Sequence, residues 1–350
     1  MDDKPDQDRA EERPLTTAGS SAETPLLQTP PEFAVAEDVH SIVTGELVAG
    51  TSLGRDAWRR LLKNKLAVLG MIIGATIVVA ALIGPTLINR VTGYAYDFIP
   101  KDPALTKSFP PFHSPDGSFS WTHPMGTDNA GRDIFARVLS GGQISLMVAF
   151  IATFVSLVIG VSYGATAGYL GGRIDDLMMR IVDVLYSLPY VIIVIVLLAL
   201  LPAKTPTGQL AQLFFALGAV SWLTMARIVR GQVMSLKNQE FILAARATGV
   251  STPKIIFRHL VPNTLGPVIV YATLTVPTVM LSEAFLSFLG LGVRPPRVSW
   301  GSLAAEGAQS LAIYPWQLIF PGVTMALMLF SLNFLGDGLR DALDPQMRRE

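Results

Sequence analysis

The sequence predicts an all-α membrane protein with six transmembrane helices and with both termini in the cytoplasm. Half of its 350 residues are hydrophobic and 15% are charged, whereas soluble domains carry about 25% charged residues. Six apolar runs reach the length of roughly 20 residues that a helix needs to cross a bilayer. Lys and Arg gather in the connections on one side of these runs, and that bias marks the cytoplasmic side.

The predicted spans are separated by connections rich in Pro, Gly and charged residues. Their expected boundaries are 66–88, 144–167, 179–201, 210–229, 265–290 and 316–334. Pro189 lies inside the third span and should kink it, and Asp183 lies near the inner end of that span. In the second span, Gly160, Gly164 and Gly168 recur every four residues, a spacing that allows close helix packing in lipid.

The spans and their flanks divide the chain into consecutive parts. Residues 1–50 are rich in Asp, Glu, Pro, Ser and Thr without apolar periodicity, which predicts a disordered acidic cytoplasmic tail. Residues 51–90 join a basic stretch around Trp58, expected to lie at the membrane interface, to the first span. The remaining parts are an extracytoplasmic segment (91–143), a five-helix core (144–339) and a short cytoplasmic tail (340–350).

Two residues of the fifth span are candidates for a gate or a helix interface. Pro277 interrupts the hydrogen-bond ladder of a helix. Glu283 is an intramembrane carboxylate, which costs about 2.5 kcal/mol or more at mid-bilayer and therefore faces the bundle or water by default. Glu283 lies toward the outer end, where that cost drops, and a structural role is favoured over a substrate contact.

The connection 231–263 between the fourth and fifth spans is polar, basic and rich in helix-forming residues. Its first helix should run from Glu240 to about Thr248, and Gly249 supplies the left-handed residue that commonly ends a helix. A second helix should start with Thr252 as its N-cap and should end at Pro262.

The first of these helices has a distinctive predicted face. Phe241, Ala244, Ala245 and Thr248 fall at i, i+3, i+4 and i+7, so they share one side of the helix. That side carries one large ring among small side chains, a shape that lets another surface come close. From spacing alone, an ordinary cytoplasmic loop with incidental helix fits equally well.

The extracytoplasmic segment holds a charged, glycine-rich block. Asp128 or Asn129 could cap a short helix there. His113 and His123 lie nearby, but solvated loop histidines are commoner than metal ligands, so no metal site is expected. The block consists of Gly126, Thr127, Asp128, Gly131, Arg132 and Asp133.

The sequence carries no recognisable chemistry of its own. It has no cysteine, no G-x-x-x-x-G-K-[ST] loop for phosphates and no H-E-x-x-H or G-x-S-x-G motif. Intramembrane charges are few, which argues against a proton or sodium relay. A membrane-anchored enzyme is therefore disfavoured, nucleic acid is not an expected partner, and a transporter of this kind needs an energy source in another subunit.

Four blocks carry a resemblance to a known family. Residues 126–133 are similar to a G-T-D-x-x-G-R-D block, with Gln143 where many members have Arg. Ala244, Ala245, Gly249 and Pro262 take the positions of an "EAA" loop, with Leu243 where many members have Glu and His259 where many have Ile. The other two blocks are E-A-x-L-S-F-L-G-L-G…P-x-x-S-W-G in 282–301 and the closing L-G-D-G-L-R-D-x-L-D-P. Together they resemble the C-type membrane permease subunit of the dipeptide/oligopeptide (and nickel) ABC importer family.

The resemblance implies a type I ABC importer permease fold in the bacterial inner membrane. It implies a non-catalytic subunit that forms half of a pathway for di- and oligopeptides. The EAA loop would be the coupling helix that docks on an ATPase subunit, with Glu240, Phe241, Ala244, Ala245, Thr248, Gly249 and Pro262 as its residues.

The same resemblance implies several partners. These are a second homologous permease, two ABC ATPase subunits that carry ATP and Mg, an extracytoplasmic substrate-binding protein and membrane lipid. The chain itself would bind no cofactor. Nickel chelates, glutathione or oligosaccharides remain alternative cargoes, and an ATP-independent channel or secondary carrier is an alternative of another class.

Overall fold

The computed structural model describes residues 53–114 and 116–343. In this part of the chain, the regular elements are helices joined by loops. Its β-structure consists of two isolated bridges. Five of its helices are long and apolar enough to cross a membrane, and one bent pair would make a sixth span. The predicted all-α class is confirmed there. The acidic tail expected over 1–50, and most of the tail expected over 340–350, lie outside the described residues.

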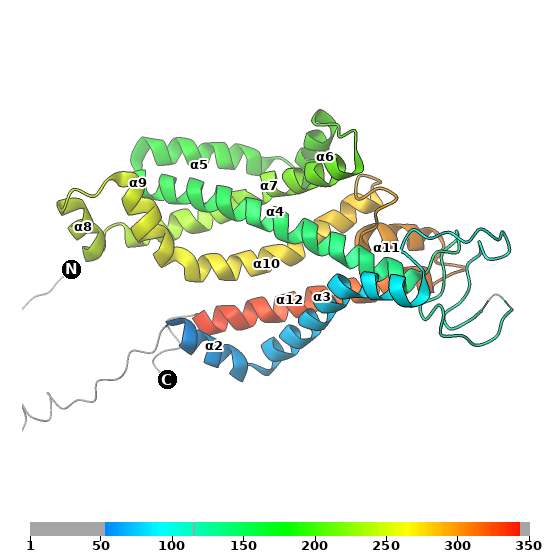
Figure 1. Ribbon diagram of the computed structural model, residues 1–350. Coiled ribbons are helices and arrows are strands. Elements are labelled where there is room, and N and C mark those ends of the chain that lie inside the picture. Colours follow the sequence, from blue (N-terminus) through cyan, green and yellow to red (C-terminus); the bar gives the residue numbers. More distant parts are fainter. Residues whose placement is uncertain (1–52, 115, 344–350) are drawn as a thin grey trace, which may run out of the picture. The chain divides into compact units, whose positions relative to one another are not determined.

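The transmembrane helices follow the predicted order and extend beyond most of the predicted boundaries (Figure 1). Polar residues outside the apolar runs continue each helix, so hydropathy alone underestimates its length. The helices that form the spans are α3 (Lys65–Thr92), α4 (Ile134–Leu170), α5 (Gly172–Ser187), α6 (Tyr190–Leu200), α7 (Pro206–Leu236), α10 (Val261–Phe288) and α12 (Trp316–Leu343). Shorter elements are α2 (Leu53–Lys63), α8 (Glu240–Ala247), α9 (Thr252–Lys254), a π-helix (Ile255–Leu260) and α11 (Trp300–Gln309).

Helices α4 and α7 form the most extensive pair of the bundle, and the glycine stripe of α4 lies in their interface. A Cβ at Gly160 would lie 2.6 Å from the Cβ of Met225, and one at Gly168 would lie 2.8 Å from the carbonyl oxygen of Arg230. At Gly164 a Cβ would collide with the carbonyl of Ala226. The close packing predicted from the four-residue spacing is therefore confirmed.

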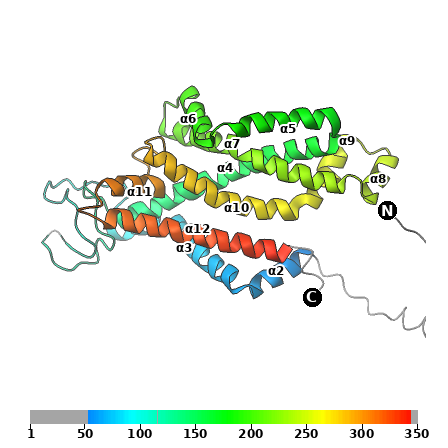
Figure 2. The same ribbon diagram turned by 180° about the vertical axis from the view of Figure 1, so that it is seen from behind.

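A second group of helices packs around the first span. Helix α12 lies along α3, and α2 lies near the end of α12, as Figure 2 shows from behind. Ser331 of α12 donates a hydrogen bond of 2.7 Å to the carbonyl oxygen of Gly70. The missing side chain of Gly70 permits this approach, because a Cβ there would lie 2.7 Å from the Ser331 carbonyl oxygen.

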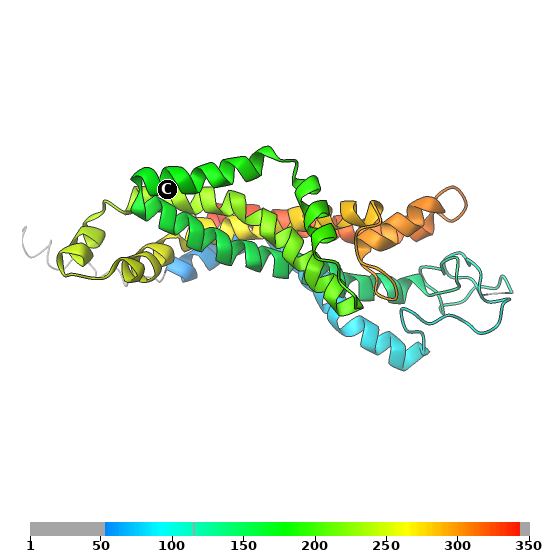
Figure 3. The same ribbon diagram turned by 90° about the horizontal axis from the view of Figure 1, so that it is seen from above.

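The predicted kink at Pro189 is a full break in the helix. Helices α5 and α6 meet at 92°, and the bend is clearest from above (Figure 3). Leu188, which precedes the proline, adopts an extended conformation with ψ 140°, as expected from the clash between a proline ring and the residue before it. Helix α5 is tied back to α7 by Asp175, whose buried carboxylate accepts from Arg230 at 2.5 and 2.6 Å.

Helix α4 starts at Ile134, ten residues before the predicted start of the second span at 144. Asp133, not Asp128 or Asn129, is the N-cap, and its side chain accepts from the backbone N–H of Ala136 at 2.7 Å. Helix α11 lies in the connection between the fifth and sixth predicted spans and was not predicted. Ser299 and Ser302 form its capping box.

The second helix of the 231–263 connection also differs from its prediction. Ser251, not Thr252, is the residue before its first turn, and Pro262 does not end it. Helix α9, the π-helix and α10 form one continuous helix, Thr252–Phe288. Pro262 sits in the first turn of α10 directly after the π-helix, in which Val261 donates to the carbonyl of Ile256 five residues back. The wider turn makes room for a ring that would clash in a regular helix.

Replacing Gly164 by leucine should destabilise the chain, because the new side chain would collide with the backbone of α7. Overpacking of this kind costs about 1–3 kcal/mol, occasionally more. The midpoint of thermal unfolding in detergent, followed by tryptophan fluorescence, should fall by several degrees. Gly266→Leu is the matched control, since a Cβ at that α10 position meets nothing within 4 Å. Equal midpoints for the two variants would contradict the packing described.

Candidate functional site

Helix α8 has the boundaries expected for the first helix of the 231–263 connection, to within one residue. It begins after Gln239, whose backbone is extended with ψ 153°, and it ends at Ala247. Gly249 then adopts φ +76°, and Val250 donates back to the carbonyl of Ala245 at 3.1 Å. Glycine favours this left-handed geometry because other residues pay a steric penalty there.

The two faces of α8 differ in burial. Phe241, Ala244 and Thr248 are exposed as predicted, and the ring of Phe241 is 39% exposed. Ala245 is not part of that face: it is buried beside Ile242 in a core cluster. The prediction placed Ala245 on the wrong side because it gave no weight to Ile242, whose apolar side chain sets the buried face.

The exposed surface of α8 contains one residue that the predicted set lacks. Leu243 is 49% exposed and adds a second large apolar side chain, and Glu240 is exposed at the start of the helix. The i, i+3, i+4 pattern did not include Leu243. An apolar residue in an otherwise polar loop could have indicated a contact surface there. Pro262 lies outside α8 altogether, in the first turn of α10.

The buried face of α8 joins several transmembrane helices. Ile242 and Ala245 belong to one cluster with side chains of α4, α7, the π-helix and α10: Val161, Ala165, Met225, Val229, Val233, Ile255, Ile256, Leu260 and Val268. Helix α8 therefore cannot shift without disturbing its packing against α4, α7, the π-helix and α10.

Polar contacts attach α8 to the end of α4. The guanidinium of Arg246 lies 4.9 Å from the ring centre of Tyr169, and its Nε donates to the Tyr169 hydroxyl at 3.1 Å. Lys237, just before α8, donates to the carbonyl of Gly168 at 3.0 Å. Both cations donate to acceptors in the last turn of α4, and the helix dipole favours positive charge there.

The glycine-rich block of the segment 91–143 lies against the start of α4. Gly126 and Gly131 adopt φ of +77° and +76°. The hydroxyl of Thr127 accepts from Phe109 at 2.7 Å and donates to the carbonyl of Lys107 at 2.8 Å. Asp133 caps α4 and contacts Nδ1 of His123 at 2.7 Å.

Asp128 is the centre of a buried charge network. Its carboxylate accepts from Arg132 at 2.7 Å and from Arg137, and Arg137 also donates to Glu306 of α11 at 2.9 Å. The predicted block did not include Arg137, although Arg137 is only 9 residues from Asp128, and it did not include Glu306, which is 169 residues from Arg137. The network fastens the segment to α4 and α11. Within the described residues, no group of three or more His, Asp or Glu side chains is arranged to hold a metal ion.

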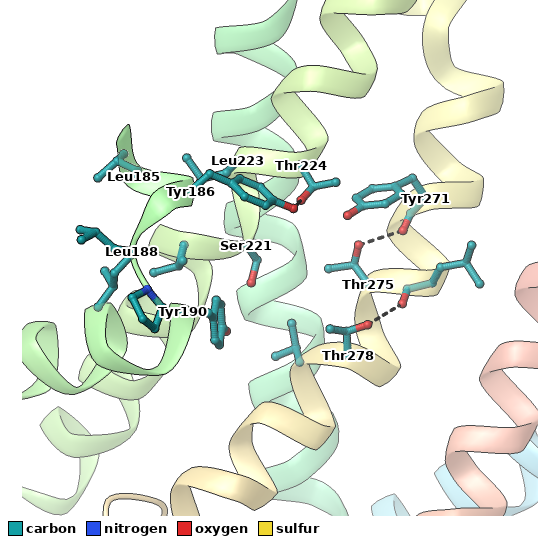
Figure 4. Close-up of a pocket in the computed structure, with 15 residues that line it drawn as sticks. Leu185, Tyr186, Leu188, Tyr190, Ser221, Leu223, Thr224, Tyr271, Thr275 and Thr278 are labelled. Atoms are coloured by element: carbon teal, nitrogen blue, oxygen red, sulfur yellow. Dashed lines mark hydrogen bonds between the residues drawn. The ribbon is translucent and has the colours of Figure 1, made fainter. Parts of the chain in front are cut away.

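A cavity of about 600 Å³ lies between the α5–α6 junction, α7 and α10 (Figure 4). Apolar side chains make most of its wall, and none of the described residues that line it is charged. Its polar lining is made of hydroxyl groups: Tyr186, Tyr190, Ser221, Thr224, Tyr271, Thr275 and Thr278.

The four gate or interface candidates lie in different places. Pro189 lines the cavity, and Pro277 is buried inside α10. Glu283 is 1% exposed and accepts from Ser287 at 2.8 Å and from Ser299 at 2.7 Å, so it ties α10 to the cap of α11. Asp183 pairs with Arg227 at 2.7 Å beside the cavity.

Two family models match this chain. Residues 160–349 match the family described as "Binding-protein-dependent transport system inner membrane component", and residues 52–111 match the N-terminal TM domain of oligopeptide transport permease C. Among solved structures, an inward-facing MetNI methionine ABC transporter matches 59% of this chain and 96% of its own chain, with 22% identity and a TM-score of 0.47.

Several characterised proteins can be aligned with this chain over most of their own length and most of its length. The oligopeptide transport system permease protein OppC of Escherichia coli (strain K12) is 47% identical over 86% of this chain and 94% of its own. OppC of Bacillus subtilis (strain 168) is 42% identical over 91% and 97%, and the dipeptide transport system permease protein DppC of the same strain is 44% identical over 85% and 87%. The chain therefore belongs to the inner-membrane components of binding-protein-dependent transport systems, and within them to the peptide-type permeases.

Proposed function

We propose that this chain is one of two permease subunits of an ATP-driven importer of di- and oligopeptides. Its role is to form half of the translocation pathway and to receive motion from an ATPase subunit through α8. The observation that carries this proposal is the two-sided burial of α8, whose inner face is built into the transmembrane core while its outer face is exposed. Its relatives are oligopeptide and dipeptide permease proteins, which supports peptides as the cargo.

The exposed face of α8 fits a groove on a partner. Phe241 and Leu243 offer two large apolar side chains beside the small surface of Ala244. Aromatic residues, Phe among them, are enriched in protein interfaces. We infer that the partner is an ATPase subunit which holds ATP and Mg, and that Gly249 and Thr248 fix the end of the docked helix.

The transmission of force follows from the packing of α8. Ile242 and Ala245 share their core cluster with α4 and α7, and these two helices are themselves locked by the glycine interface. A shift of α8 should therefore move α4 and α7 as one body. ATP changes the population of inward- and outward-facing states only if the assembled complex binds ATP with different affinity in the two states.

The orientation of the chain is part of the proposal. Helices α8 and α2 lie at one end of the bundle, and the loop 93–133 and α11 lie at the other (Figure 1). The excess of Lys and Arg at the α8 end supports a cytoplasmic location for that end. The opposite end, braced by Asp128 and Arg137, would then face the extracytoplasmic binding protein.

Ala244→Trp should prevent docking without affecting the fold, because Ala244 is exposed on α8 and its Cβ points away from the core. ATPase subunits that co-purify with the wild-type chain from detergent should be lost, and peptide uptake should fall to background. Ala75→Trp, at an exposed position inside α3 and away from both ends of the bundle, is the matched control. Normal ATPase recovery and normal uptake by the Ala244 variant would refute the docking assignment.

Arg246→Met should uncouple the assembled transporter, because it removes the guanidinium that joins α8 to Tyr169 while it keeps an apolar stem. ATP hydrolysis should continue, and the amount of peptide imported per ATP should fall severalfold. Tyr169→Phe retains the ring and should keep most of the coupling, since cation–π attraction depends on the ring face. Arg258→Met removes an equal charge from the neighbouring π-helix and serves as control. An unchanged ratio of transport to hydrolysis in the Arg246 variant would show that this contact carries no force.

A further inference from the structure

We propose that α2 binds the headgroups of anionic phospholipids in the leaflet at its end of the bundle. The binding surface consists of a row of three exposed cations beside a row of two exposed apolar side chains. Its residues are Arg55, Arg59 and Lys63 in the basic row, and Trp58 and Leu62 in the apolar row. The inference does not depend on the import function, because it requires only that α3 crosses the membrane.

The place of α2 is fixed by the start of α3. Only Asn64 separates the two helices, and its backbone is extended with ψ 106°. The Asn64 side chain accepts from the backbone N–H groups of Leu66 and Ala67 at 3.1 and 3.2 Å and so caps α3. Helix α3 is long and apolar enough to cross the bilayer. Helix α2 therefore lies where this span leaves the hydrocarbon core, near the end of α12 (Figure 2).

One row of α2 is used for packing within the chain. Residues four apart share a helix face, and Ala57 and Leu61 form such a pair against α12. Leu61 is 2% exposed, and a Cβ at Gly338 of α12 would lie 3.0 Å from its Cδ1. The next row around the helix is apolar but is not covered, since Trp58 is 55% exposed and Leu62 is 49% exposed. The same helix is thus held by one apolar row and presents a second one.

The basic row lies directly beside the exposed apolar row. Arg55, Arg59 and Lys63 follow each other at four-residue spacing and are all exposed. Within the part of the chain that the structure describes, none of the three forms an ion pair with a carboxylate. The remaining row, Asp56 and Arg60, lies on the side of the helix opposite the apolar row. The one acidic residue of α2 is therefore turned away from the exposed apolar side chains.

A bilayer surface matches both exposed rows at once. An amphipathic helix in this position buries its apolar row at the boundary between acyl chains and headgroups, and tryptophan is enriched at that level. Lys and Arg then extend their charged ends to the phosphates. Each such cation favours an anionic surface by about fivefold, the ratio that corresponds to 1 kcal/mol. The row of Asp56 and Arg60 would face water in this arrangement.

The acidic stretch 1–50 of the same chain is another source of negative charge. It contains eleven Asp or Glu residues and three Lys or Arg. A polar acidic segment matches the basic row, but it does not match Trp58 and Leu62, whose contact with water would then persist. Anionic lipid matches the charge and the apolar side chains together, and the structure therefore favours lipid.

The test measures which phospholipid lies next to α2. The chain has no native cysteine, so Leu62→Cys carries a single bimane fluorophore. The full-length chain is reconstituted in nanodiscs with equal amounts of phosphatidylglycerol and phosphatidylcholine, and one of the two lipids carries a nitroxide quencher on its acyl chains. The association constant from quenching should be at least about fivefold larger for phosphatidylglycerol than for phosphatidylcholine.

The triple variant Arg55→Gln, Arg59→Gln and Lys63→Gln should bring this ratio close to one. Glutamine keeps the helix propensity of the replaced residues and removes their charge. Higher ionic strength should lower the ratio for the unsubstituted basic row in the same way, because salt screens exposed charges. The salt measurement needs no substitution in the basic row, so it stands even if the triple variant folds poorly.

A second triple variant is the matched control. It removes three exposed cations from the loops at the other end of the bundle and should keep the preference for phosphatidylglycerol. Its substitutions are Lys101→Gln, Lys107→Gln and Arg294→Gln. A ratio near one with the basic row intact, or equal ratios in the two triple variants, would overturn the proposal. A fluorophore that neither lipid quenches, and that an aqueous quencher reaches only at high salt, would assign the basic row to the acidic stretch 1–50 and would also overturn it.

Discussion

The burial of Ile242 and Ala245 is the constraint on which the rest of the account depends. Helix α8 is too short to be stable alone, since isolated helices below about 12–15 residues are marginal in water. Its stability comes from the cluster that it shares with α4, α7, the π-helix and α10. The residues that hold α8 in place are therefore also the residues through which it can move the bundle.

Two further features make this attachment rigid. The glycine stripe of α4 brings its backbone against α7, so that the two helices have little room to slide. The contact between Arg246 and Tyr169 joins α8 directly to the last turn of α4. The cavity lies along α7 and α10, beyond this rigid region, with the broken pair α5–α6 as its third wall. The break at Pro189 lets α6 run at 92° to α5, and residues of this junction line the cavity.

The sequence predicted most of the helices because apolar length and breaking residues are local signals. The spans, the break at Pro189 and the end of α8 at Gly249 follow from such signals. The start of α4 was missed although its cap, Asp133, is a local signal. Helix α11 was missed because a tertiary contact stabilises it: Trp300 is buried and donates to the carbonyl of Val138 at 2.8 Å. Continuation of the helix through Pro262 depends on the π-helix before it, which no residue pattern indicated.

The candidate site was predictable in part. The exposed face of α8 follows from helical spacing, but the side of the helix on which Ala245 lies depends on its neighbours in space. The cavity could not be predicted, because Tyr190, Ser221 and Tyr271 come from three helices that are brought together only in the folded bundle. The network of Asp128, Arg137 and Glu306 has the same origin, since Arg137 and Glu306 are far apart in the chain.

The most direct test of the central claim is a cross-linking measurement on the assembled complex. The chain has no native cysteine, so Ala244→Cys places a single thiol on the outer face of α8. After oxidation, mass spectrometry should identify a disulfide between this position and a cysteine introduced in the helix-binding groove of a nucleotide-hydrolysing subunit. A thiol that instead reacts with a membrane-impermeant reagent from outside intact cells, and forms no adduct with an ATPase, would contradict the account.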